Sequence, residues 1–69
     1  MIDGYRRGHQ AGADEARIRN HSLPQEEIQS LAHKSLARLR RDGYAHLEPE
    51  NEFVQGFCVG YVDYLYLNN

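Results

Sequence analysis

Four histidines and one cysteine are the side chains of this sequence that could bind a metal ion or act as a nucleophile. They are His9, His21, His33, His46 and Cys58. Zinc sites usually contain a close ligand pair, such as two histidines four residues apart on a helix or a Cys-x-x-Cys motif, and no such pair occurs here. The cysteine lies in an apolar run, where a thiol is normally an unreactive core residue. We therefore expect no metal, no cofactor and no enzymatic activity.

Clustered charges are the second feature that could do chemistry, by binding phosphate groups. Four basic residues crowd the middle of the chain: Lys34, Arg38, Arg40 and Arg41. Nucleic-acid-binding surfaces use such clusters, but three glutamates follow closely and could pair with them: Glu48, Glu50 and Glu52. A net charge of −2 also gives the chain no general attraction to polyanions. Nucleic-acid binding is therefore the alternative hypothesis, and we do not expect it.

The elements that position these side chains are predicted to be helices. Apolar residues recur three or four residues apart in the middle segment: Ile28, Leu31, Ala32, Leu36 and Leu39. Pro24 and Pro49 are each followed by acidic residues, as is typical of helix starts. We predict an all-α domain with helices at about 2–19, 23–42 and 49–67. A strand at 57–67 is rejected because no second strand could pair with it.

The ends of the second predicted helix carry their own signals. Ser22 and Gln25 have the spacing of a capping box, in which each side chain bonds a free backbone N–H of the other. Gly43 follows the basic cluster and predicts a left-handed residue that ends the helix.

Glycine recurs every fourth residue in the first and third predicted helices. These residues are Gly4, Gly8, Gly12, Gly56 and Gly60. An interior glycine costs a helix about 1 kcal/mol relative to alanine, so close contact with another helix must offset the loss. Two helices with glycines four apart can cross at short distance. We therefore predict that the first and third helices pack glycine face to glycine face, braced by the second.

The pattern Gly-aromatic-x-x-Gly occurs twice, at 4–8 and at 56–60. Glycine at every fourth residue beside aromatic residues resembles the Gly-x-x-x helical repeats of Yae1-like adaptor proteins. This resemblance implies a protein-binding role.

The end of the third predicted helix carries more large side chains than two neighbouring helices can cover. They point in several directions because successive residues lie about 100° apart. We predict the following protein-binding residues: Val59, Tyr61, Val62, Tyr64 and Tyr66. Tyrosine is enriched at interfaces and among their hot spots.

Length and composition set the class of protein. A chain of 69 residues forms one domain, 1–69, and its 41% apolar share favours a folded chain. The single cysteine, with no signal peptide and no apolar run of about 18 residues, predicts a cytoplasmic protein without a membrane span. One core of this size rarely supplies more than about 3–5 kcal/mol, so a protein partner or a homodimer would help. We predict a compact inhibitor or adaptor, of the kind that phages and mobile elements encode, which binds a larger protein.

Overall fold

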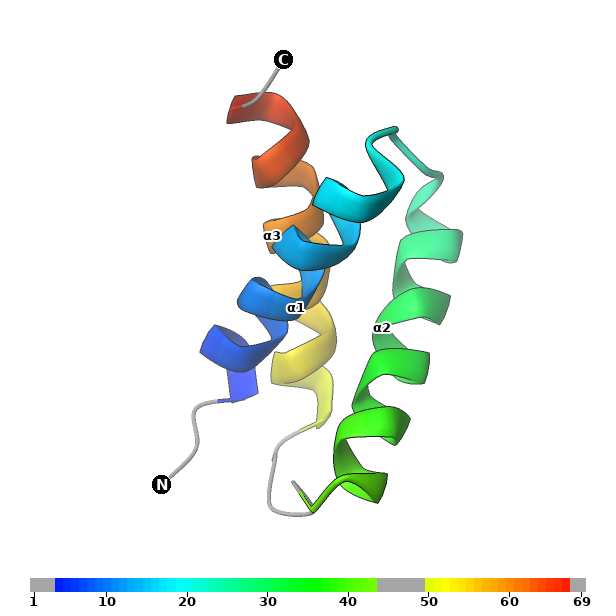
Figure 1. Ribbon diagram of the computed structural model, residues 1–69, viewed down its shortest axis with the longest axis vertical. Helices are drawn as coiled ribbons and strands as arrows, with labels where there is room; N and C mark the ends of the chain where they lie inside the picture. The colour runs from blue at the N-terminus through cyan, green and yellow to red at the C-terminus, as the bar shows by residue number, and fades with distance from the viewer. Residues whose placement is uncertain (1–3, 44–49, 68–69) are drawn as a thin grey trace.

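The computed structural model describes residues 4–43 and 50–67, which form three helices (Figure 1). Helix α1 spans Gly4–Arg19, α2 spans Gln25–Arg41 and α3 spans Glu50–Leu67. The predicted all-α, three-helix fold is confirmed, and the described helix ends lie within two residues of their predicted positions. The expected starts at residues 2 and 49, together with His46 and Glu48, lie outside the described residues.

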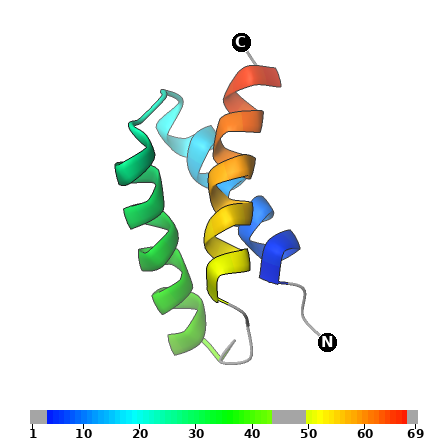
Figure 2. The same ribbon diagram turned by 180° about the vertical axis from the view of Figure 1, so that it is seen from behind.

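The helices in closest contact are not neighbours in the chain. Helices α1 and α3 run in the same direction and cross, and α2 runs in the opposite direction beside them (Figures 1 and 2). Helices α1 and α3 pack by far the most closely, whereas α2 packs chiefly on α3 and barely touches α1. Helix α2 thus returns the chain so that α3 can lie along α1.

Small residues form the buried face of α1: Gly4, Gly8, Gly12 and Ala16. This face meets the backbone of α3. A Cβ atom at Gly8 would overlap the carbonyl oxygen of Phe53 and lie 3.0 Å from its Cα, and a Cβ at Gly12 would meet Phe57 in the same way. Both distances are shorter than van der Waals contact, so these two positions have room for a hydrogen atom and not for a methyl group.

The contact is reciprocal. A Cβ at Gly56 would overlap the carbonyl oxygen of Tyr5, and one at Gly60 would overlap that of His9. In glycine this position holds a Cα hydrogen, so each of the four glycines directs a hydrogen at a carbonyl of the other helix. This is the arrangement of Cα–H···O contacts at close helix crossings. The structure thus places these four glycines at the crossing of α1 and α3. We predict that the absence of side chains there is what allows the close approach, and substitutions can test this.

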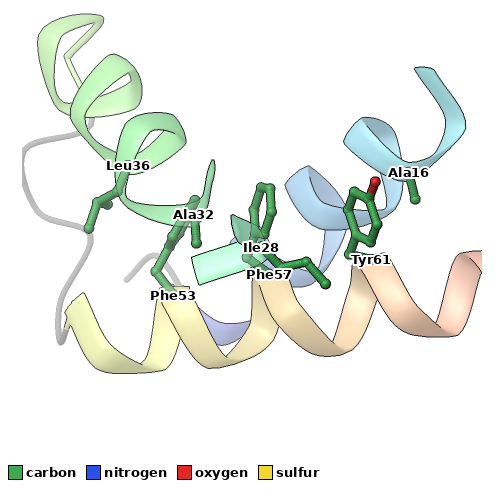
Figure 3. Packing of buried hydrophobic residues seen from close by; sticks show 7 residues of the cluster. All are labelled: Ala16, Ile28, Ala32, Leu36, Phe53, Phe57 and Tyr61. Atoms are coloured by element: carbon green, nitrogen blue, oxygen red, sulfur yellow. The ribbon is translucent and has the colours of Figure 1, made fainter. Parts of the chain in front are cut away.

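A second face of α3 carries large rings. Phe53, Phe57 and Tyr61 are fully buried, and their rings extend from α3 into the space between α1 and α2 (Figure 3). They complete the core with four residues of the other helices: Ala16, Ile28, Ala32 and Leu36. The rings therefore fill the space that the three helices enclose, whereas at the glycines α3 and α1 meet backbone to backbone.

The helix ends differ in part from the prediction. Gly43 follows α2 with φ 105°, in the positive range expected. The predicted capping box of Ser22 and Gln25 is wrong: Pro24 is the N-cap of α2, and no side chain hydrogen-bonds there. A residue that precedes proline is driven out of the helical conformation, so Leu23 stays outside the helix and Ser22 lies too early to cap it.

Candidate protein-binding surface

The predicted protein-binding residues divide between surface and core. Tyr66 is 81% exposed and Val62 is 50% exposed, while Val59 and Tyr64 are half-buried. The prediction for Tyr61 is wrong, because its side chain is fully buried. It follows Phe57 by four residues and therefore lies on the same face of α3.

The buried Tyr61 ties the connection between α1 and α2 to α3. Its hydroxyl donates a hydrogen bond of 2.7 Å to the carbonyl oxygen of His21. Burial raises the pKa of this hydroxyl, an effect that the nearby Arg19 opposes and Glu15 reinforces. The Tyr61 hydroxyl thus remains a protonated donor, and its role in the molecule is structural.

An open apolar hollow lies between the start of α2 and the end of α3. It has a volume of about 190 Å³, and its lining includes Leu23, Ile28, Leu65 and Tyr66. Val62 belongs both to this hollow and to a second one, which also contains Cys58 and Val59. We call the resulting stripe of α3 the α3 patch; it consists of Val59, Val62, Leu65 and Tyr66. Sequence reasoning missed Leu65 and the contribution of α2.

Charge is sparse around the α3 patch. Asp63 is the one charged residue of the sequence between Phe53 and Leu67, and its carboxylate lies 3.7 Å from Nε2 of His9. Burial raises the pKa of the Cys58 thiol, which keeps it protonated and weakly nucleophilic at neutral pH. The α3 patch therefore presents an apolar surface with an acidic group beside it, rather than a reactive centre.

The predicted basic cluster lies on the exposed side of α2. Arg40 donates a hydrogen bond of 3.4 Å to one carboxylate oxygen of Glu50, and Nδ1 of His33 lies 3.7 Å from the other oxygen. This arginine is thus drawn to the acidic start of α3. Within the described residues, Lys34, Arg38 and Arg41 form no ion pair, and their spacing puts them on one stripe of α2.

The described histidines lie apart from one another. His9 and His33 each face a carboxylate, and Nδ1 of His21 lies 2.8 Å from the carbonyl oxygen of Arg19. In residues 4–43 and 50–67, no three His, Cys, Asp or Glu side chains gather closely enough to hold a metal ion. The helices of these same ranges also lack the combination of length and apolarity that crossing a bilayer requires.

No protein-family model, curated protein or solved structure matches this sequence.

Proposed function

We propose that this protein is a small non-enzymatic interaction module, a compact inhibitor or adaptor that binds another protein through the α3 patch. The observation that carries the proposal is the exposure of Tyr66 and Val62 at the edge of an open apolar hollow. Each exposed large apolar side chain forgoes up to about 2–3 kcal/mol of burial. A partner that covered both would regain much of this free energy, and tyrosine is prominent among interface hot spots.

The surroundings of the α3 patch indicate the chemistry of the partner. The hollow between Leu23, Leu65 and Tyr66 accepts an apolar side chain. Asp63 is more than half exposed beside it, and α3 has no basic residue in its last turn. The proposed partner therefore presents an apolar side chain flanked by Lys or Arg.

The test compares two neighbouring exposed residues of α3. Leu67 is 78% exposed but lies off the stripe of the α3 patch, so Leu67→Ala is the matched control for Tyr66→Ala. We expect the wild-type chain and Leu67→Ala to retain one stoichiometric protein from a cell extract and Tyr66→Ala to lose it. With that partner purified, Tyr66→Ala weakens binding more than about fivefold, or about 1 kcal/mol. Equal binding by all three chains, with helicity unchanged by circular dichroism, would contradict the proposal.

The alternative function is nucleic-acid binding by α2. One observation favours it, namely the exposed stripe of Lys34, Arg38 and Arg41, which has no ion-pair partner among the described residues. The net charge and the Arg40–Glu50 pair oppose it. In a fluorescence anisotropy titration with duplex DNA and single-stranded RNA, we expect no binding at physiological salt. Micromolar binding that weakens steeply with salt and is lost in Arg38→Ala would establish the alternative.

A further inference from the structure

An open groove runs between α1 and α2, which barely touch each other. Its two hollows are lined by residues from both helices. The apolar side chains in it are Ala11, Ile18, Leu31 and Leu39. Ile18 is 72% exposed, and the other three are half-buried. We call this surface the α1–α2 groove. Helix α3 lies behind α1 in Figure 1 and in front of it in Figure 2. The groove and the α3 patch have no residue in common, although Leu23 lines a hollow of each.

The charges on the two sides of the groove are opposite near one end and mixed near the other. Near one end, Asp14 and Glu15 of α1 share a hollow with Arg38 of α2. Near the other end, Arg19 of α1 shares a hollow with Glu27 and Lys34 of α2.

These charges are not paired across the groove within the chain. Asp14 lies 3.9 Å from Arg17, and Glu15 lies 3.0 Å from Arg19, both within α1. Among the described residues no ion pair joins α1 to α2. The basic side of α2 is therefore available to an acidic group of another molecule.

A second copy of the chain supplies that acidic group by symmetry. A two-fold axis along the groove places α1 of one copy over α2 of the other at the same level. Asp14 and Glu15 of each copy then face Arg38 of the other, and Arg19 faces Glu27. Each of these charge pairs occurs twice in the dimer. The apolar side chains of the two grooves meet between the charge pairs. We propose that the α1–α2 groove is the interface of a symmetric homodimer.

The molecule is large enough for such an interface. A standard interface buries about 800 Å² on each partner, which is about a sixth of the 4818 Å² of surface that this chain exposes. The Cα atoms alone span 34 × 19 × 18 Å, so an interface of this area takes up most of one long face made of two helices. The dimer would cover Ile18 and enlarge the small core, while the α3 patch stays open to a different partner.

The first test measures mass in solution. Sedimentation equilibrium of the full chain is expected to show a concentration-dependent dimer of twice 8.0 kDa. Ile18→Glu places a charge in each half of the interface and weakens the dimer by about a hundredfold or more. Because Ile18 is exposed in the single chain, we expect the Ile18→Glu variant to have the same helicity as the wild type by circular dichroism. Tyr66→Ala is the control on the α3 patch and leaves the dimer intact.

The second test asks whether the charges act between copies. Asp14→Arg alone and Arg38→Asp alone each place like charges opposite one another twice, and we expect each to weaken the dimer by about tenfold. Mixed together, the two variants form a heterodimer in which both pairs are attractive again, one as the natural Arg38–Asp14 pair and the other with its two charges exchanged. Native mass spectrometry can detect this heterodimer. Attraction within one chain cannot be restored by mixing, so this result separates the two explanations.

Four results would overturn the dimer. They are a wild-type chain that stays monomeric at every concentration, a dimer insensitive to Ile18→Glu, a dimer lost in Tyr66→Ala, and a mixture of the charge variants that stays monomeric. The partner-binding experiment on the α3 patch uses other residues and another readout. Each proposal can therefore fail while the other holds.

Discussion

Helix α3 packs on its two neighbours in two different ways. Toward α1 it presents Gly56 and Gly60, and the two backbones come close enough to exclude a methyl group. Toward α2 it presents Phe53 and Phe57, whose buried rings fill the space between the helices (Figure 3). The backbones of α1 and α3 lie closest together. A small-residue face thus lets two helices approach more closely than a face of large rings does.

We expect the two contacts to differ also in what stabilises them. The four glycines at the α1–α3 crossing cost about 4 kcal/mol of helix propensity. Four Cα–H···O contacts, at about 0.5–1 kcal/mol each, offset a large part of that cost, and dispersion between the close backbones adds to them. The α2–α3 contact depends instead on burying apolar side chains. We therefore expect the first contact to be intolerant of added atoms and the second to be sensitive to lost ones.

The largest expected effect comes from added atoms at the glycine crossing. Gly8→Leu and Gly60→Leu force a side chain into the backbone of the opposite helix and should lower the free energy of unfolding by more than about 3 kcal/mol. In an open helix the same change would be stabilising. Thermal melting followed by circular dichroism measures the effect, with Gln10→Ala on the exposed side of α1 as a control within about 0.5 kcal/mol. Unchanged or raised melting temperatures for both leucine variants would show that the glycines do not determine the crossing.

The next largest effect comes from lost atoms at the α2–α3 contact. Leu36 is buried in the core, so Leu36→Ala should lower the free energy of unfolding by about 2–5 kcal/mol. Leu36→Met keeps the volume and should cost less than about 1.5 kcal/mol. Urea denaturation of both variants gives the two values. If Leu36→Met is as unstable as Leu36→Ala, the α2–α3 contact does not tolerate a change of shape at constant volume. The proposed difference between the two contacts of α3 would then be wrong.

Part of this arrangement could be predicted from the sequence, because helical spacing is a local property. The apolar stripe of α2 and the glycines of α1 and α3 each follow from spacings of three and four residues. The burial of Tyr61 could also have been found, since it continues the four-residue spacing of Phe53 and Phe57. Local patterns do not contain the register that sets Gly8 against Phe53. Nor do they show that α2 barely touches α1, which leaves Leu31 and Leu39 of α2 only half-buried.

A smaller effect is expected at Tyr61, which joins the ring-packed face of α3 to the connection between α1 and α2. Tyr61→Phe keeps the ring but removes the donor to the carbonyl oxygen of His21. The free energy of unfolding should fall by about 1 kcal/mol, the usual net worth of a hydrogen bond. Urea denaturation detects this change. A fall larger than that of Leu36→Ala would instead make the hydrogen bond the main attachment of the α1–α2 connection.

The smallest effect on the free energy of unfolding is expected in alkaline solution. It comes from two titratable side chains of α3, Cys58 and Tyr61. Burial raises the pKa of the Cys58 thiol above its ordinary 9.0 and that of the Tyr61 hydroxyl above its ordinary 10.0. Below these values both groups are protonated whether the chain is folded or unfolded, so their stabilising contribution is fully present. As pH rises through them, the unfolded chain loses protons first, and the free energy of unfolding falls until the folded groups ionise too.

Two variants identify the residues that cause the free energy of unfolding to fall at alkaline pH. Cys58→Ala should flatten the part that begins near pH 9, and Tyr61→Phe should flatten the part that begins near pH 10. Urea denaturation at a series of pH values measures both. At the glycine crossing, by contrast, the atoms nearest to Gly8, Gly12, Gly56 and Gly60 are backbone atoms of the opposite helix, which do not titrate. A slope that stays the same in both variants would show that groups other than Cys58 and Tyr61 cause the fall.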